Sequence, residues 1–387
     1  MATSDTTQGT QPPAARMLSR RRFLGASALT VAGGLAVGAL SGCGSSGGGD
    51  NEVVVLGWSS YVDPEITKMM SDAGLSVRGV PAETDQEMFT KLKAGGGANY
   101  DIVFANCGWS PTYYKAGLIE AFDITEVPSY QQLYPIFRED TALPYILEPN
   151  KVILYPNLWD SLALMWNTQV AFQPSEPYSW SAMWDGQVPK GKVILKGAPE
   201  DFLAVSGLSL GVPKHKIYAM TGDELNSAAE HLAQLKPFQI GPSDDIFANA
   251  IRSEKAWIGQ ASNLAAAAKL NKTAGSEVAK AVIPKEGSLG WIDGMQLVAG
   301  AKNRANALSF MDVWSSAPVQ DFLYQTYGFS PCNRESTERQ IAAGGEAAEN
   351  IYSHGGDQPE NAKHLVFQGP PDNPAEWARA YDEIVGG

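Results

Sequence analysis

Two short segments of the chain combine aromatic rings with polar groups in a pattern that suits small-molecule binding. In the first, Trp58, Ser59 and Tyr61 follow directly after the apolar run 53–56. Ligands of open α/β sheets bind beyond the carboxyl ends of the strands, which is where these side chains are expected. Trp and Tyr are also common as half-buried packing residues, so both interpretations are open at this point.

In the second segment, a single apolar residue separates Trp291 from Asp293. On an extended strand, positions i and i+2 point to the same face, so the ring and the carboxylate would be presented together. The pair suits an ammonium group, because the ring face attracts a cation and the carboxylate accepts a charge-assisted hydrogen bond. The alternative is a solvated surface Asp beside a core Trp.

The elements that must position these residues alternate between strand and helix, as in parallel α/β sheets. About 340 residues follow the first 42, more than one hydrophobic core usually supports, so we expect two domains. The expected strands are 53–56, 75–80, 100–104, 192–195, 256–259 and 278–283. The expected helices are 85–93, 111–116, 201–208, 223–235, 262–270, 310–314 and 319–324, with two more beginning at Pro64 and Pro374.

The chemistry of common enzymes lacks its minimum parts in this sequence. There is no Gly-x-Ser-x-Gly elbow between a predicted strand and a predicted helix, no phosphate loop and no His-Glu-x-x-His motif. The four histidines, His215, His231, His354 and His364, show no metal-ligand spacing. We therefore expect a binding protein rather than an enzyme, with no metal and no cofactor.

The net charge of the chain is strongly negative, at −13. Residues 1–42 contain four Arg and one Asp, so the rest carries −16. A field of this sign repels nucleic acid and anionic lipid head groups and favours the approach of cationic ligands. Acidity also serves solubility, so the charge by itself does not identify a cationic ligand.

The first 42 residues have the pattern of an export signal. Arg20 and Arg21 lie in a twin-arginine box, an uncharged small-residue stretch follows, and Leu40-Ser41-Gly42-Cys43 closes it as a lipobox. We expect cleavage before Cys43, lipidation of its sulfur, and a flexible tether over 43–51. The mature protein would then touch the outer face of a bacterial cytoplasmic membrane through the lipid anchor alone. An uncleaved membrane anchor is the alternative, disfavoured because this stretch is weakly hydrophobic.

Two cysteines, Cys107 and Cys332, remain after Cys43. An exported protein reaches a compartment that permits disulfides, so the two could pair. Cys is also among the most buried residue types, and two buried free thiols are the other possibility.

Taken together and in order, several segments resemble the periplasmic spermidine/putrescine-binding proteins of ABC transporters. The segments that carry this resemblance are 57–64, 88–97, 100–119, 179–184, 284–293, 301–303 and 327–329. The resemblance implies a type II periplasmic-binding-protein-like α/β fold, in which two lobes joined by crossing strands close on a ligand about a hinge. It places the first lobe at 52–160 plus 294–340 and the second at 161–293 plus 341–387.

The resemblance also implies a set of ligand-binding positions in the cleft between the lobes. Residues of the family type or close to it stand at Trp58, Ser59, Tyr61, Trp291, Asp293 and Gln368. Residues that differ from the family type stand at Asn106, Gly108, Ser262 and Phe329. Of two acidic positions after the middle strand, the first falls at Gly197, and Glu200 or Asp201 is the candidate for the second, with Asp201 preferred.

These matches predict an amine ligand. Each buried ammonium group needs its own anion, and the matched positions provide one carboxylate, Asp293, and a second candidate, Asp201. A diamine, or a ligand with a single amine end, is therefore favoured over a longer polyamine. Absence of the aromatic walls at Gly108 and Ser262 is expected to widen the pocket.

The resemblance therefore implies an extracytoplasmic lipoprotein that delivers a polyamine or related cationic amine to an ABC permease and its ATPase. We expect the protein to be a monomer. Two alternatives stay open. One is the same fold with another solute, such as an amino-acid derivative, an opine, a phosphonate or a thiamine-like compound. The other is a sensor lipoprotein without a transport partner.

Overall fold

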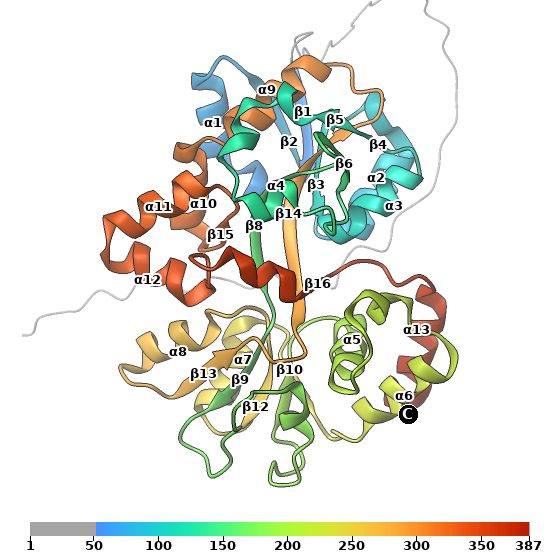
Figure 1. Ribbon diagram of the computed structural model, residues 1–387, viewed down its shortest axis with the longest axis vertical. Coiled ribbons are helices and arrows are strands. Elements are labelled where there is room, and N and C mark those ends of the chain that lie inside the picture. Colours follow the sequence, from blue (N-terminus) through green and yellow to red (C-terminus); the bar gives the residue numbers. More distant parts are fainter. Residues whose placement is uncertain (1–51, 387) are drawn as a thin grey trace, which may run out of the picture. The chain divides into compact units, whose positions relative to one another are not determined.

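The computed structural model describes residues 52–386, which fold around two main sheets (Figure 1). The signal and lipidation positions Arg20, Arg21 and Cys43 lie outside the described residues. Within 52–386, no helix has both the length and the apolar character needed to cross a membrane.

The first sheet has the strand order β15-β8-β14-β3-β1-β2, with β4 and β16 also paired to β14. Its strands are β1 (Glu52–Gly57), β2 (Ser76–Pro81), β3 (Ile102–Asn106), β4 (Ile119–Glu120), β8 (Tyr155–Ser161), β14 (Ser288–Val298), β15 (Ser330–Pro331) and β16 (Leu365–Phe367). The apolar runs of β1 and β3 are buried on both faces and pair in parallel, as their sequences predict. The three predicted strands at 53–56, 75–80 and 100–104 are confirmed as β1, β2 and β3.

Helices cover both faces of this first sheet (Figure 1). They are α1 (Pro64–Asp72), α2 (Asp85–Gly95), α3 (Ser110–Lys115), α4 (Pro135–Glu139), α9 (Arg304–Trp314), α10 (Ala317–Tyr327), α11 (Arg334–Ala343) and α12 (Gly345–His354). Helix α1 begins as predicted, because the Asp63 side chain accepts a hydrogen bond from the Glu65 N–H at 2.7 Å and Pro64 occupies the first helical position. Between β4 and β8 in chain order, three short strands form a small separate sheet: β5 (Phe122–Asp123), β6 (Ile146–Glu148) and β7 (Lys151–Val152).

The second sheet has the strand order β11-β10-β12-β9-β13. Its strands are β9 (Ala163–Asn167), β10 (Val193–Leu195), β11 (Gln239–Ile240), β12 (Ile258–Ala261) and β13 (Ala279–Val282). Its helices are α5 (Pro199–Ser209), α6 (Gly222–Ala233), α7 (Asp244–Arg252), α8 (Ala266–Ala274) and α13 (Pro374–Ala380). Helix α8 begins four residues later than predicted, and Ser262 lies before it, with its hydroxyl donating to Asp244 Oδ1 at 2.7 Å.

Short helical turns complete the chain. The 3-10 turns are η1 (Ser59–Val62), η2 (Gly96–Ala98), η3 (Cys107–Trp109), η4 (Ile124–Glu126), η5 (Pro128–Gln132), η6 (Trp180–Trp184), η7 (Lys214–Ala219) and η8 (Pro359–His364), and η9 (Tyr381–Val385) is a π-helical turn.

Two long strand passages connect the sheets (Figure 1). A single residue separates strand β8 from strand β9. Along this passage the chain moves from one hydrophobic core to the other, because Trp159 packs in the core of the first sheet and Leu162 packs in the core of the second. Strand β14 changes cores in the same manner between Leu289 and Ile292. The predicted architecture of two α/β lobes joined by crossing strands is confirmed.

The C-terminal part of the chain returns to the first lobe before it crosses to the second. Helix α12 packs against α11. At its end, His354 Nδ1 lies 2.5 Å from Asp160 Oδ2 on the crossing strand β8, and both side chains are fully buried. The chain then forms β16 along β14 and ends with α13 in the second lobe's core.

Candidate ligand-binding site

The carboxyl end of β1 places the first aromatic segment at the edge of the first sheet. The Tyr61 ring is buried, with its centroid 4.9 Å from that of Phe104 and 5.7 Å from that of Trp314. Its hydroxyl donates a hydrogen bond to Asp293 Oδ2 at 2.9 Å. Trp58 meets the Tyr61 ring edge-on at 5.6 Å and is half-buried. The structure thus joins the two segments that the sequence analysis singled out.

Strand β14 presents the second segment on the same side of the sheet. Trp291 and Asp293 are two residues apart on an uninterrupted stretch of strand, so they share a face, as predicted. The Trp291 ring contacts Phe329 edge-on, with ring centroids 5.3 Å apart. Ser59 is exposed at the start of η1. Five of the predicted positions therefore belong to one group: Trp58, Tyr61, Asp293, Trp291 and Phe329.

Asn106 stands directly opposite Asp293 on the neighbouring strand β3 and is buried. Its backbone N–H donates to Asp85 Oδ1 at 3.0 Å. Sequence reasoning missed Asp85, the first residue of α2. The signal was available, because α2 follows β2 and the carboxyl ends of parallel strands share one edge. The helix cap is supplied by Thr84, whose hydroxyl accepts from the Glu87 N–H, so Asp85 is free to face the site.

The two carboxyl groups at this edge are hard to ionise without a cation. Burial and, to a smaller extent, the charge of Asp85 raise the pKa of Asp293 to about 8, against the lowering effect of the Tyr61 hydrogen bond. Burial also raises the pKa of Asp85 to about 6, although the hydrogen bond from the Asn106 N–H stabilises the ionised carboxylate and lowers the pKa. Two neighbouring carboxylates with raised pKa values are typical of a functional site.

A second polar group lies where the second lobe meets the chain after β16. Gln368 Nε2 donates to Asp201 Oδ1 at 2.7 Å, and the Ala198 N–H donates to Asp201 Oδ2 at 2.9 Å. Burial raises the pKa of Asp201. The structure brings the predicted pair Asp201 and Gln368 together, but both oxygens of this carboxylate already have protein donors.

The expectation that Gly108 widens the pocket is wrong. A Cβ on Gly108 would lie 2.2 Å from the carbonyl oxygen of Gln368 and 3.1 Å from Gly369 Cα. The glycine is therefore required by the close approach of two backbone segments, which already fill that space. Ser262 lines a cavity of about 190 Å³ between α7 and α8 in the second lobe.

Cys107 and Cys332 are free, buried thiols in the structure. Strands β14 and β8 lie between β3, which precedes Cys107, and β15, which precedes Cys332. Two intervening strands, each about 4.8 Å from the next, keep the two Cα atoms beyond the ~7 Å that a disulfide spans. Of the two possibilities left open by the sequence, the structure has the free thiols. Burial raises the pKa of both thiols well above the ordinary value.

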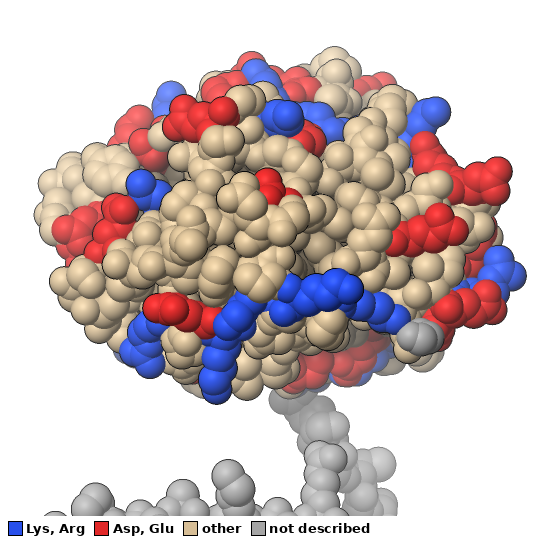
Figure 2. Space-filling model, turned by 90° about the horizontal axis from the view of Figure 1, so that it is seen from below, with Lys and Arg blue, Asp and Glu red and all other residues tan. Residues whose placement is uncertain are grey.

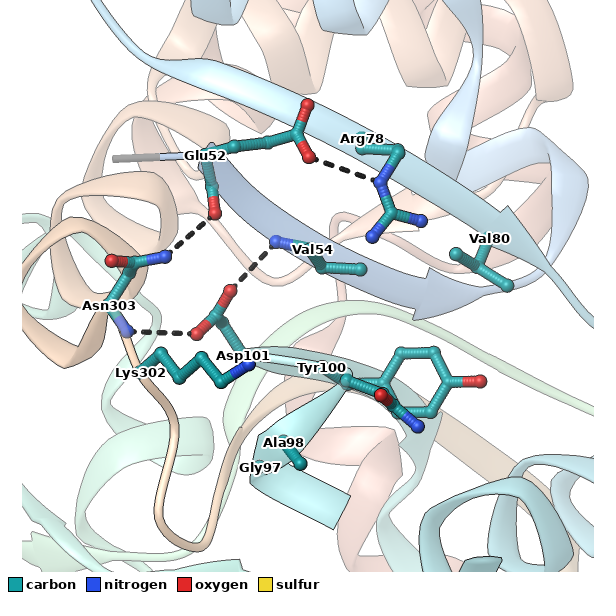
Figure 3. Close-up of a pocket in the computed structure, with 11 residues that line it drawn as sticks. Glu52, Val54, Arg78, Val80, Gly97, Ala98, Tyr100, Asp101, Lys302 and Asn303 are labelled. Carbon is teal, nitrogen blue, oxygen red and sulfur yellow. Dashed lines mark hydrogen bonds and ion pairs between the residues drawn. The ribbon is translucent and has the colours of Figure 1, made fainter. Parts of the chain in front are cut away.

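A cavity of about 660 Å³ lies away from this group, beside the start of β1 (Figure 3). Asp101 accepts hydrogen bonds there from the N–H groups of Val54 (2.9 Å) and Asn303 (3.0 Å), and Arg78 pairs with Glu52 at 3.1 Å. These groups bond to one another and hold β1, β2 and the 302–303 turn together. Within residues 52–386, no cluster of His, Cys, Asp and Glu has the composition of a metal site.

Acidic and basic side chains both occur on the outer end of the second lobe, where a run of basic side chains crosses the face (Figure 2). The negative charge of the chain is therefore not concentrated on that end.

Two α/β lobes joined by crossing strands, with aromatic rings and carboxylates gathered at a sheet edge, are the architecture of a solute-binding protein. The chain belongs to the bacterial extracellular solute-binding protein family, whose model matches residues 66–349.

One relative is the spermidine/putrescine-binding periplasmic protein of Salmonella typhimurium, 26% identical over 304 residues, which cover 77% of this chain and 83% of the relative. Among solved structures, the spermidine/putrescine substrate-binding protein PotD of Streptococcus pneumoniae superposes with a TM-score of 0.67 at 20% identity, covering 86% of this chain and 98% of that one. A GABA receptor superposes with a TM-score of 0.60 at 19% identity, covering 87% and 96%. At these identities the structural likenesses establish the fold alone.

Proposed function

We propose that this protein is the solute-binding component of an ABC importer and that it binds a polyamine, such as putrescine or spermidine, or a related cationic amine between its lobes. The observation that carries the proposal is the group Trp291, Asp293 and Tyr61. Asp293 is fixed by the Tyr61 hydroxyl at 2.9 Å and shares a strand face with the Trp291 ring. A ring and an oriented carboxylate together bind an ammonium group through cation–π attraction and a charge-assisted hydrogen bond. The names of the relatives point to the same ligand class.

Calorimetric titration with putrescine and spermidine tests this function. Asp293→Asn should weaken binding by about 2 to 4 kcal/mol, because the bound cation would lose its anion in a desolvated site. Trp291→Ala should lose about 1 to 2 kcal/mol from the ring face and its packing. A parent protein that binds neither amine, or an Asn variant as tight as the parent, would refute the polyamine assignment.

A ligand with a single ammonium end is the second candidate. Both oxygens of Asp201 accept protein hydrogen bonds, from Gln368 and Ala198, so the second-lobe carboxylate is less available to a second cation than Asp293 is. The fold shared with a GABA receptor is compatible with an amino acid of this kind. Titration with GABA beside putrescine separates the two candidates.

The cellular setting of the protein is also a proposal. The lipobox supports lipidation at Cys43, and the twin-arginine pair Arg20 and Arg21 supports export, which together would hold a monomeric protein on the outer face of the cytoplasmic membrane near its permease. Release of a Cys43→Ala variant from the membrane fraction is the expected result, and unchanged membrane association would contradict it. We place the hinge at 159–162 and 289–292, where the crossing strands change cores, and assign α12 to the first lobe.

A further inference from the structure

We propose that Asp85 and Asp293 together form the ammonium subsite of this cleft, that Asp85 is therefore a second ligand-binding carboxylate, and that binding of an amine there releases a proton to solvent. The inference rests on the proposed function and identifies a determinant that the resemblance does not include.

Asn106 fixes the relative position of the two carboxyl groups. Its backbone N–H holds Asp85 Oδ1 at 3.0 Å, and its Cα is the direct cross-strand partner of Asp293. The second carboxylate is oriented from the other side by the Tyr61 hydroxyl, which donates to Asp293 Oδ2. Both carboxyl groups thus have one oxygen anchored, and both are held at the same cross-strand position of β3 and β14. The charge of Asp85 contributes to the raised pKa of Asp293.

Each of the three side chains keeps one polar atom without a partner. Within residues 52–386, Asp85 Oδ2, Asp293 Oδ1 and Asn106 Nδ2 form no hydrogen bond to another residue. Asn106 is only 7% exposed, and its Oδ1 is taken by the Gly108 N–H, which leaves the NH₂ group unpaired. None of these three atoms is fully enclosed by protein, so all three are accessible to a ligand at one strand pair.

The surroundings supply no positive charge to these carboxylates. The titratable groups that face them are Tyr61 on η1, Tyr113 on α3, and the thiols Cys107 and Cys332, and burial raises the pKa of all four, which keeps them neutral at pH 7. No Lys or Arg of the described chain forms an ion pair with either carboxylate. An ammonium ligand is therefore the cation that would allow both groups to ionise.

The proton balance follows from this arrangement. Burial raises the pKa of Asp293 to about 8 and that of Asp85 to about 6, so the coupled pair keeps about one proton near pH 7 in the ligand-free site. The incoming amine is already protonated, so its positive charge stabilises the second carboxylate. The Asp293 carboxyl then loses its proton to the buffer, and one ammonium faces two anions.

Calorimetric titration of the full mature chain with putrescine at pH 7, in phosphate and in Tris, tests the inference. The difference in observed enthalpy between the two buffers gives the number of protons released, which should be roughly one per ligand for a carboxyl group with its pKa above the working pH. Asp85→Asn should weaken putrescine at least about tenfold and release fewer protons, because the remaining carboxyl group loses its anionic neighbour. The Asn side chain retains an acceptor for the Asn106 N–H, so the fold should persist.

Asp72→Asn is the matched control, since Asp72 is an exposed residue of α1 in the same lobe and the variant makes the same change in charge. It should leave affinity and proton count unchanged. If the parent binds putrescine but Asp85→Asn binds it equally tightly, Asp85 is not part of the subsite and the inference is wrong while the proposed function stands. If the parent binds putrescine without releasing a proton, the proton step is wrong. If the parent binds no amine, the proposed function and this inference fail together.

Discussion

At the residue scale, the central feature is a carboxyl group that is stable in its place only when it is protonated or when a cation is bound. Asp293 is oriented by Tyr61, raised in pKa by burial and by Asp85, and placed beside Trp291. Ionising such a group in a poorly hydrated site is costly, and under the proposed function a bound cation would offset that cost.

The cost of ionising Asp293 predicts how the stability of the ligand-free protein depends on pH. The pKa of Asp293 is raised in the folded state, so the native protein binds a proton more tightly than the unfolded chain does. Its stabilising contribution is fully present below about pH 4, the unfolded pKa, and is lost progressively as the pH rises to about 8. Asp85, with its pKa raised to about 6, acts in the same direction over a narrower window.

Thermal unfolding of the ligand-free parent and of Asp293→Asn from pH 5 to 9 measures this effect. The variant, which carries no ionisable group at 293, should gain in melting temperature relative to the parent as the pH rises towards 8, and the difference should then level off. Parallel curves for the two proteins would show that the carboxyl group at 293 titrates normally.

At the scale of elements, the site depends on the contact between the turn η3 and the chain that follows β16. Gly108 in η3 lies against the Gln368 carbonyl, and the Gln368 side chain holds Asp201 of α5. The backbone contact between Gly108 and Gln368 thus connects the first lobe to the Gln368 side chain, which bonds to Asp201 in the second lobe.

Gly108→Ala should disturb both ends of this connection. The added Cβ would lie 2.2 Å from the Gln368 oxygen, so the backbone must shift, at a cost in unfolding free energy of roughly 1 to 3 kcal/mol. The shift should also displace the Gln368 side chain from Asp201 and weaken ligand binding. Denaturant unfolding and calorimetric titration measure the two effects.

Gly186→Ala is the control for that experiment, because a Cβ there meets no atom within 4 Å. It should leave stability and affinity close to those of the parent. A Gly108→Ala variant that behaves like this control would mean that the 368–369 segment does not lie as close to η3 as the structure has it.

At the scale of the whole described chain, two hydrophobic cores are connected through β8, β14 and the segment after β16. In each crossing strand, side chains three positions apart pack in different cores. A bending motion between the lobes would therefore require changes in the backbone angles of only a few residues. Ligand binding between the lobes can therefore shift the population towards a closed form without unfolding either core.

Small-angle scattering of the mature protein with and without saturating putrescine tests closure. We expect a smaller radius of gyration in the presence of the amine and no change in molecular mass, as a monomer requires. Identical scattering curves for a protein that binds the amine by calorimetry would argue that the cleft is already closed without ligand.

Local sequence patterns by themselves determined a large part of this protein. The parallel strands β1 and β3, the capped start of α1 at Asp63-Pro64, and the shared face of Trp291 and Asp293 depend on residues near one another in the chain, so propensity and periodicity predict them. The order and spacing of the resembling segments indicated the two-lobe fold, and the crossing strands confirm it.

Only the tertiary structure decided which of these residues meet. Asp85 and Asn106 are 21 residues apart, and Asp201 and Gln368 are 167 apart, so no local pattern shows their hydrogen bonds. No local pattern shows the surroundings of Gly108 either: the absence of a side chain there predicts open space, but the backbone at Gln368 fills that space. Burial and hydrogen bonding between distant segments are set by how the sheets pack, and that packing places Asp85 beside Asp293 and leaves Cys107 and Cys332 unpaired.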